Sequence, residues 1–436
     1  MKDEELLKEI IAQNIHWESG KIEIPNKIIE RTVSSQLKKE LNEKQVIALI
    51  GLRSVGKTTI IKLLMKHLLI NKIEPKKIFY FSLDGLQKEE KIIKQIIDLY
   101  SRNLLRKPIN ESKDTIYLFF DEIQKVKDWG EEIKSYYDKN LKIKFIISGS
   151  SSMNILKGSG ESLVGRIIIH KIYPFSFTEF LKYNNVEIEK INLHNLAYPS
   201  KAEKISILFE DYITIGGFPL FYSSPEEIRK SLLKSMVDLT FYRDIVNIFD
   251  VKRTDVLEGL FSIFIKESGN VINYSNLSNS LKTKFETIKS YMGYLSSSFL
   301  ISKSSFYSGS KVKSLEKNEK IYVADHSFGL LQEIELGLKI ETIIFNSLKS
   351  LGFDIFYWQD ENKNEVDIVF FGKSPEVIEV KYQSKILDSD LKGLYSFLEN
   401  YKIKRAIVIT KNIFEIKKKK GIEMRFIPAW LFLLSV

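Results

Sequence analysis

Short and almost uninterrupted apolar runs alternate with amphipathic stretches along the first third of the chain. The apolar runs cover residues 46–50, 78–83, 116–120 and 144–148, and helical spacing is seen in 57–70 and 92–105. Strands that are apolar throughout are buried on both faces, and their alternation with helices is typical of a parallel sheet covered by helices. The pattern therefore predicts an α/β core in residues 1–170, with a polar, largely helical segment ahead of its first strand.

The pattern changes after residue 170 and predicts three further domains. Residues 171–250 are mostly helical and are expected to form a helical lid. Residues 251–325 predict two short helices, a longer helix and a pair of strands, which is a winged-helix pattern. Residues 326–436 return to mixed α/β. A chain of 436 residues is too long for one ordinary hydrophobic core, so a division into several domains is expected.

The amino-acid composition excludes several kinds of site and catalysis. Cysteine is absent, which excludes disulfides, thiolate metal sites and cysteine catalysis, and five histidines argue against a multi-histidine metal site. The net charge of +10 fits either a polyanionic partner or a lysine-rich solvated surface. A charged amino terminus and a last apolar run of only 427–434 predict no signal peptide and no membrane span, so the cytoplasm is the expected location.

The pattern G-x-x-x-x-G-K-[ST] occurs at residues 51–58, between a predicted strand and a predicted helix. Two glycines allow the backbone to wrap closely around phosphates, while consecutive N–H groups and the start of the helix point at the anion. Lys57 is expected to reach the β- and γ-phosphate oxygens, and the Thr58 hydroxyl to ligate Mg²⁺. The residues of this loop expected to bind ATP are Gly51, Arg53, Ser54, Val55, Gly56, Lys57, Thr58 and Thr59.

Another apolar strand, 116–120, ends in Asp121-Glu122. Asp121 is expected to hold Mg²⁺ through a water molecule, and Glu122 to orient and deprotonate the water that attacks the γ-phosphate. A protein that only senses nucleotide does not need the glutamate. The pair therefore predicts an enzyme that hydrolyses ATP with Mg²⁺, in which Glu122 and Lys57 are catalytic.

Two further positions are candidates for contact with nucleotide. The run 144–148 is followed by Gly149-Ser150, and in AAA-type ATPases a polar side chain here senses the γ-phosphate. Ser148 or Ser150 fits this role, and a simple strand-ending turn explains either serine equally well. Arg166 stands where such ATPases carry an arginine finger for a neighbouring subunit's nucleotide, with a structural arginine as the alternative. Arg166 is therefore a candidate catalytic residue, and a homo-oligomer is a candidate assembly.

Several blocks resemble one prokaryotic family, the archaeal and bacterial AAA+-superfamily P-loop ATPases with a C-terminal winged helix and a restriction-endonuclease-like (PD-(D/E)XK) domain. The blocks are residues 52–59, 120–124, 163–166, 173–180, 216–219 and 242–245. Pro-Phe-Ser-Phe-Thr-Glu-Phe at 174–180 and Gly-Gly-Phe-Pro at 216–219 are far more specific to this family than the nucleotide motifs. The resemblance covers about residues 30–385. Ser54 departs from the family, which often has a second arginine there, at a position that by its pattern contacts neither phosphate nor metal.

The resemblance implies a nuclease-like core near the C-terminus. Two short predicted strands carry Asp367 and the pair Glu379 and Lys381, and the predicted helix before them carries Glu341. In such a core the acids bind Mg²⁺ and the lysine polarises the water that attacks a phosphodiester. The candidate metal ligands are Glu341, Asp367 and Glu379, and the candidate catalytic residues are Asp367, Glu379 and Lys381. A degenerate nuclease fold whose charged residues form a solvated ion-pair cluster is the alternative.

DNA is the expected partner besides ATP. Basic residues lie on or near the expected recognition helix (Lys282, Lys284, Lys289), at the expected wing (Lys311, Lys313) and within 402–405 and 417–420. The chain is therefore predicted to be an Mg-dependent AAA+-type ATP hydrolase that couples nucleotide state to DNA binding, remodelling or processing. The alternatives are a regulatory switch that acts on a protein partner and an ATP-gated DNA nuclease.

Overall fold

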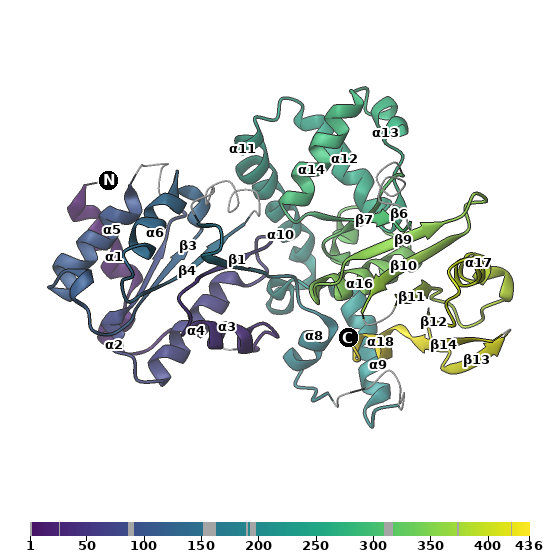
Figure 1. The fold of residues 1–436 in the computed structure, drawn as a ribbon, viewed down its shortest axis with the longest axis horizontal. Helices are drawn as coiled ribbons and strands as arrows, with labels where there is room; N and C mark the ends of the chain where they lie inside the picture. Colours follow the sequence, from purple (N-terminus) through teal and green to yellow (C-terminus); the bar gives the residue numbers. More distant parts are fainter. Residues whose placement is uncertain are drawn as a thin grey trace. The chain divides into compact units, whose positions relative to one another are not determined.

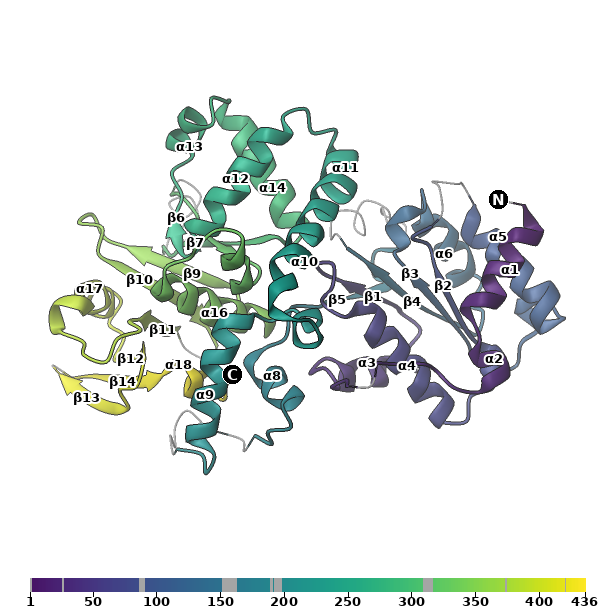
Figure 2. The same ribbon diagram turned by 180° about the vertical axis from the view of Figure 1, so that it is seen from behind.

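The computed structural model describes residues 2–25, 27–85, 91–150, 163–188, 191, 198–308, 317–372, 375–419 and 421–436. The chain forms two compact units, Met1–Ile172 and Tyr173–Val436, which Figure 1 and Figure 2 show from opposite sides. The predicted wing residues Lys311 and Lys313, and Lys420, lie outside the described residues.

The first unit is a parallel five-stranded sheet covered by helices on both faces (Figure 1). Its strands are β1 (Val46–Ile50), β2 (Ile78–Ser82), β3 (Ile116–Asp121), β4 (Ile143–Gly149) and β5 (Ile167–Lys171), in the order β2-β3-β4-β1-β5. Its helices include α1 (Asp3–Gln13), α2 (His16–Ser19), α3 (Ser34–Glu40), α4 (Lys57–Ile70), α5 (Ile92–Tyr100) and α6 (Trp129–Tyr137). Helices α3 and α4 lie on one face of the sheet, and α1, α5 and α6 on the other (Figure 2). The predicted α/β core is confirmed.

The strand order decides where polar side chains meet. Strand β4 lies between β1 and β3, and each strand is parallel to its neighbours. The carboxyl ends of β1, β3 and β4 therefore lie side by side at one edge of the sheet. Ligands of open α/β sheets bind at this edge, so the loop after β1 faces the ends of β3 and β4.

Side chains from the amino-terminal segment bind the outer edge of β2. Asn14 Oδ1 accepts from the Tyr80 N–H at 2.8 Å, and its Nδ2 donates to the Tyr80 carbonyl at 2.7 Å. The Trp17 indole N–H donates to the Ile78 carbonyl at 2.9 Å. Polar groups at the edge of β2 are thereby hydrogen-bonded without a sixth strand.

The second unit is built on a nine-stranded mixed sheet in the order β13-β14-β12-β11-β10-β9-β7-β8-β6. The strands are β6 (Asn270–Val271), β7 (Ile301–Phe306), β8 (Lys320–Val323), β9 (Ile355–Gln359), β10 (Glu365–Phe371), β11 (Pro375–Val380), β12 (Arg405–Thr410), β13 (Glu415–Lys419) and β14 (Ile422–Pro428). The helices include α8 (Phe177–Tyr183), α9 (Ala202–Ile215), α10 (Glu226–Leu239), α11 (Asn247–Phe249), α12 (Thr254–Lys266), α13 (Tyr274–Ser280), α14 (Phe285–Ser297), α16 (Leu336–Ser350), α17 (Lys392–Asn400) and α18 (Ala429–Leu433).

One sheet joins the predicted third and fourth domains. Strand β7 pairs antiparallel with β8 and also pairs parallel with β9, through Ser305 opposite Phe356. The helices and strands expected within 251–325 are present as α12, α13, α14, β7 and β8. Because β7 connects them to β9, the segments 251–325 and 326–436 share backbone hydrogen bonds rather than a flexible linker.

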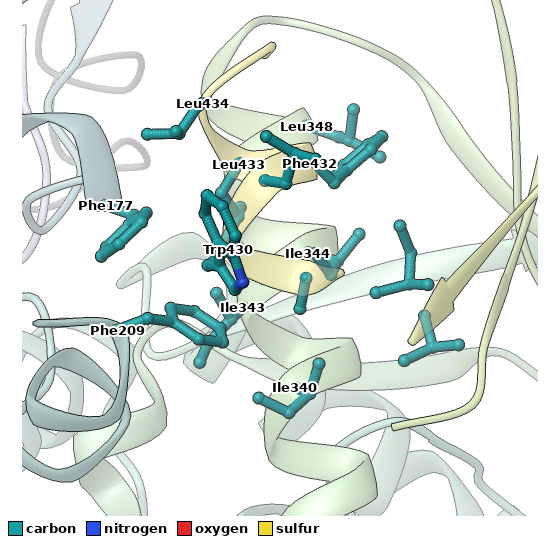
Figure 3. Packing of buried hydrophobic residues seen from close by; sticks show 14 of the residues in the cluster. Phe177, Phe209, Ile340, Ile343, Ile344, Leu348, Trp430, Phe432, Leu433 and Leu434 are labelled. Atoms are coloured by element: carbon teal, nitrogen blue, oxygen red, sulfur yellow. The ribbon is translucent and has the colours of Figure 1, made fainter. Parts of the chain in front are cut away.

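Helices of the predicted lid pack into the core of this second unit. Figure 3 shows Trp430 of α18 between the rings of Phe177 on α8 and Phe209 on α9 and the apolar face of α16. From α16, Ile343 and Ile344 enter the same cluster. Burial of large aromatic and aliphatic side chains stabilises by about 1.5–3 kcal/mol each, so this cluster fixes α8 and α9 within the second unit.

Two of the sequence blocks on which the predicted resemblance rests, residues 173–180 and 216–219, contact each other. The Phe175 N–H donates to the Gly217 carbonyl at 2.6 Å, and the Gly217 N–H donates to Asp325 Oδ2 at 3.0 Å. A Cβ at Gly217 would lie 2.7 Å from Asp325 Oδ2 and 2.8 Å from the Phe175 carbonyl oxygen. Glycine is required because the two backbones and the aspartate approach closer than any side chain allows.

Candidate functional site

The loop between β1 and α4 has the backbone geometry of a phosphate cradle. Gly51 has φ of 156°, and a Cβ there would lie 2.2 Å from the carbonyl oxygen of Ile172. Gly56 has φ of 96°, in the left-handed region, directly before the first residue of α4. Both positions need glycine, and a glycine-containing turn directly before a helix is the backbone arrangement that binds phosphates.

Lys57 and Thr58 open α4 on the inner side of this loop. The Lys57 ammonium donates to the carbonyls of Gly51 and Leu52 at 2.9 and 2.8 Å, and the side chain is buried. These contacts hold the ammonium beside the loop, where a β- or γ-phosphate would be within its reach. Of the other predicted loop residues, Arg53 and Thr59 are half-buried, Ser54 is exposed and Val55 is buried.

Asp121 joins the helix to the strand ends. Thr58 Oγ1 donates to Asp121 Oδ2 at 2.6 Å. The Ser148 hydroxyl at the end of β4 donates to Asp121 Oδ1, and the Tyr80 hydroxyl donates to Oδ2 at 3.2 Å. Thr58 and Asp121 are therefore placed together as the sequence predicts for a pair of Mg²⁺ ligands. A hydroxyl and a carboxylate beside a phosphate cradle fit a hard cation that keeps water and phosphate oxygens as its other ligands.

Glu122 follows in an uncommon backbone conformation. Its φ is 59°, in the left-handed region that a non-glycine residue occupies at a cost of about 1 kcal/mol. Its N–H donates to Ser148 Oγ at 3.2 Å, and the Gln124 amide donates to its Oε2. The same amide nitrogen donates to Ser150 Oγ at 3.0 Å. The carboxylate is thus held by neighbours at the sheet edge where the phosphate cradle lies.

Ser148 and Ser150 both belong to this network. Ser148 is fully buried and contacts the carboxylate of Asp121, while Ser150 contacts the amide of Gln124. Ser148 therefore contacts the candidate metal-binding acid of the site, and Ser150 contacts the side chain that holds the candidate base.

Two residues of this site were not predicted from the sequence. Arg31, ahead of α3, donates from Nη1 to the carbonyl of Val55 at 2.8 Å, and this nitrogen lies 3.9 Å from a Cβ built at Gly56. Tyr80 of β2 reaches Asp121, and burial, together with the charge of Asp121, raises the pKa of its hydroxyl above the usual range. Neither residue lies in a motif; each is brought to the site by the tertiary fold.

Arg166 lies at the opposite edge of the sheet. Its carbonyl accepts from the N–H of Val46, at the beginning of β1, whereas the phosphate cradle follows the end of that strand. Its Nε donates to Asp138 Oδ1 at 3.2 Å, and the guanidinium lies 5.8 Å from the ring centre of Tyr137. Arg166 therefore lies away from the nucleotide site of its own chain. Its role as an arginine finger at the site of a second subunit stays a prediction.

The predicted nuclease residues converge in the second unit. Glu341 of α16, Asp367 of β10 and Glu379 of β11 are all buried, and they line a cavity of about 540 Å³. The Asp367 Oδ2 accepts from the Val380 N–H at 2.8 Å, and Lys381 Nζ lies 2.6 Å from Glu379 Oε1. An unpredicted residue, Lys320 of β8, forms ion pairs with Glu341 at 2.6 Å and Asp367 at 3.2 Å.

The acids of this cluster are the predicted ligands of Mg²⁺. Among the described ranges, no group of three or more His, Cys, Asp or Glu residues is placed to hold a metal ion. The space between Glu341 and Asp367 is taken by the ammonium of Lys320. The residues as arranged therefore do not fit the expected metal.

Burial and charge determine the proton affinities of this cluster. Burial, together with the neighbouring Asp367, raises the pKa of Glu341 to about 8 and that of Glu379 to about 8. Burial also acts on Asp367, but Lys320, Lys381 and the Val380 N–H outweigh it and lower the pKa of that carboxyl. The lysines thus favour the ionised form of Asp367, while burial favours the protonated forms of Glu341 and Glu379.

Comparisons agree with the geometry of the first unit. The AAA domain family matches residues 43–181, which contain the phosphate cradle, Asp121 and Glu122. The first unit therefore carries an AAA-type ATPase domain with a P-loop. Two domains of unknown function, DUF8612 and DUF4143, match residues 206–336 and 336–432.

The chain belongs to the same family as the uncharacterized protein MJ1544 of Methanocaldococcus jannaschii. The two are 31% identical over 388 residues, which is 86% of this chain and 82% of the relative. An uncharacterized protein of Haemophilus influenzae is 26% identical over 396 residues, 87% of this chain and 92% of its own. The Aeropyrum pernix ORC1 protein solved in complex with DNA is similar at a TM-score of 0.32 and 9% identity, over 72% of this chain and 94% of that one. Likeness at that score assigns neither fold nor function.

Within the described ranges, no helix is both long and apolar enough to cross a membrane.

Proposed function

We propose that the chain is an Mg-dependent ATP hydrolase. The observation that carries the proposal is the hydrogen-bonded set at the carboxyl edge of the first sheet, where Thr58 contacts Asp121 at 2.6 Å and Ser148 contacts both Asp121 and Glu122. This arrangement supports the proposal, because the side chains proposed to act on metal, phosphate and water lie around one loop.

Each residue has a distinct task in this proposal. The N–H groups of the loop and Lys57 hold the phosphates, and Thr58 and Asp121 hold Mg²⁺, which neutralises charge on the phosphate oxygens when bound. Glu122 accepts a proton from the attacking water, and Gln124 orients its carboxylate. Arg31 keeps the loop in shape through the Val55 carbonyl.

The test is the rate of phosphate release by the purified full chain. Lys57→Ala is expected to abolish ATP binding, whereas Glu122→Gln is expected to bind ATP and lower turnover by about 100-fold or more. Glu122→Asp serves as the matched control, because it keeps the charge and shortens the reach. Unchanged turnover in Glu122→Gln would show that the hydrolysis assignment is wrong.

We further propose that nucleotide state is coupled to DNA. The elements within 251–325 have the order of a winged helix, and Lys282, Lys284 and Lys289 are exposed on or beside α14. The first unit adds a hollow of about 740 Å³ whose lining includes five basic residues and one acid (Lys94, Arg102, Arg106, Lys107, Lys139; Asp98). Basic side chains of this kind contact phosphates without reading sequence.

The hollow and the nucleotide site lie at opposite edges of the first sheet. Lys107 and Lys139 lie in the segments that lead into β3 and β4, whereas Asp121 and Gly149 end these strands. A polyanion bound in the hollow would therefore leave the P-loop accessible to ATP.

Fluorescence anisotropy with labelled duplex and single-stranded DNA, across a salt series, tests the DNA proposal. Binding that weakens steeply with salt supports it. Charge reversal at Lys282 and Lys289, compared with reversal at Arg102 and Lys107, identifies which surface binds. Absence of binding at low salt contradicts DNA association and favours the alternative, a switch that acts on a protein partner.

Nuclease activity is the remaining alternative. The convergence of Asp367, Glu379 and Lys381 supports a restriction-endonuclease-like ancestry for the second unit, whereas the position of Lys320 argues against metal-dependent cleavage. Plasmid incubated with Mg²⁺ or Mn²⁺, with Asp367→Ala as the control, decides this point.

A further inference from the structure

Lys320 occupies the centre of the buried carboxylate cluster. Its Nζ is 2.6 Å from Glu341 Oε1 and 3.2 Å from Asp367 Oδ1, and it also contacts Glu365. The side chain is 1% exposed. Carboxylates that converge from a helix and a strand are the ligand set of a hard divalent cation. Here an ammonium group stands at the point where they converge.

Lys381 is bound differently. Its Nζ contacts Glu379 alone among the ion pairs of the described residues, at 2.6 Å, and its side chain is 28% exposed. It therefore lies at the rim of the cavity, where solvent can replace its partner. The two lysines of one cluster thus provide an internal comparison: one is central and fully buried, the other peripheral.

Four carboxylates of the cluster (Glu341, Glu365, Asp367 and Glu379) contact two ammonium groups, those of Lys320 and Lys381. Glu379 Oε2 is buried and has no hydrogen-bond partner in the described structure, and Glu379 lines the cavity. An oxygen in that position is ready to accept a cation, and none of the basic side chains in the described ranges reaches it.

Lys320 is held in place by the fold itself. It comes from β8, where it lies opposite Val271 of β6 and Ser304 of β7. Strand β7 in turn pairs with β9, beside the strand that carries Asp367. Tyr322 on the same strand donates its hydroxyl to Glu341 Oε1 at 2.7 Å. A covalently attached cation on a paired strand does not diffuse away as a metal ion does.

We propose that Lys320 is the resident cation of this cluster and that it keeps divalent metal ions out of it. The cluster is therefore a latent metal site, which a single substitution at Lys320 opens. The proposal does not depend on ATP hydrolysis by the first unit.

Binding of Mn²⁺ to the full chain, followed by electron paramagnetic resonance without nucleotide, tests the proposal. All proteins carry Asp121→Asn, so that the metal site of the P-loop is removed. The parent is expected to bind no Mn²⁺ in the cluster, while Lys320→Met gains one ion with an affinity at least about tenfold tighter than that of the parent. Lys381→Met, which removes the same charge at the rim, is expected not to gain it. Adding Asp367→Asn to Lys320→Met is expected to abolish the gain.

Two results would overturn the proposal. One is a parent protein that binds one Mn²⁺ which Asp367→Asn abolishes, because the site would then accept metal with Lys320 in place. The other is a folded Lys320→Met that gains no Mn²⁺.

A measurement on the Asp121→Asn parent alone covers the case in which Lys320→Met does not fold. Lysines are acetylated with and without Mn²⁺, and Lys320 and Lys381 are quantified by mass spectrometry. Lys320 is expected to stay unmodified in both conditions while Lys381 reacts. Lys320 that becomes reactive when Mn²⁺ is added would mean that the metal displaces it, and the proposal would be wrong.

Discussion

Thr58 Oγ1 and Asp121 Oδ2 lie 2.6 Å apart, although 63 residues separate them in the chain. Thr58 is the second residue of α4, and Asp121 is the last residue of β3, which lies two places from β1 in the sheet. Their contact fixes the distance between the phosphate cradle and the acid at the end of β3, so both can serve one Mg²⁺.

Removing the hydroxyl of Thr58 is expected to separate ATP binding from turnover. Thr58→Val should keep the shape of the helix but lose one metal ligand, so the rate of hydrolysis is expected to fall by about 100-fold. Thr58→Ser retains the hydroxyl and should stay within a few-fold of the parent. The measurement is phosphate release over a range of Mg²⁺ concentrations, and equal rates for the valine and serine variants would contradict the role of Thr58.

Arg31 is expected to support the P-loop from outside the motif. Its Nη1 donates to the Val55 carbonyl at 2.8 Å, and a hydrogen bond from a charged group contributes about 1.5–3 kcal/mol. Arg31→Ala should therefore weaken ATP binding by at least about tenfold in calorimetric titration. Lys38→Ala, which removes an ion pair with the exposed Glu30, is the control and should leave the affinity unchanged.

Gly217 is expected to tolerate no side chain. A Cβ would lie within 2.8 Å of Asp325, Phe175 and Pro174, so Gly217→Ala should lower the melting temperature of the second unit markedly. Gly293 offers the opposite case, because it lies exposed within α14 and a Cβ there would meet nothing within 4 Å. Gly293→Ala should stabilise the helix by about 0.5–1 kcal/mol. Equal effects of the two substitutions in calorimetric melting would contradict the close packing.

The second unit is expected to lose stability between about pH 5 and pH 8. Burial raises the folded-state pKa of Glu379 to about 8, so the folded chain retains a proton that the unfolded chain releases near pH 4.5. The free energy of unfolding therefore falls as pH rises through this window, by about 1 kcal/mol per pH unit for such a group.

Hydrogen exchange of peptides from β10 and β11, measured across this pH range and corrected for intrinsic exchange, gives the local stability. Glu379→Gln, which cannot ionise, should remove the share of the dependence that Glu379 contributes, while Glu341, whose pKa is also raised to about 8, keeps its own share. A pH dependence identical to that of the parent would contradict the raised pKa of Glu379.

The site residues that could be predicted from the sequence lie in short motifs. Lys57, Thr58, Asp121 and Glu122 were identified because a glycine-rich loop and a strand end fix their chemistry within a few residues. Asp367 and Glu379 followed from the same kind of local order, since the hairpin of β10 and β11 brings them together.

Residues that reach a site only through strand pairing or packing between distant parts of the chain were not predicted from the sequence. Lys320 lies 47 residues from Asp367 and reaches it only because β7 pairs with β9 as well as with β8. A lysine in an apolar strand indicates that its ammonium group is buried next to an acidic residue, but the sequence alone does not identify that acidic residue. Arg31 was missed for the same reason, because the segment before α3 has no regular pattern that would place it against the loop.

The hydrogen bonds from Asn14 and Trp17 to β2 have a practical consequence. A strand whose outer backbone groups lack partners invites another chain to add to the sheet, which leads to aggregation. The AAA domain match begins at residue 43, so a fragment cut there would lose both side chains and expose β2. The amino-terminal segment thus covers the edge strand β2 and is expected to prevent self-association through it. The ATPase domain should therefore be expressed with this segment attached.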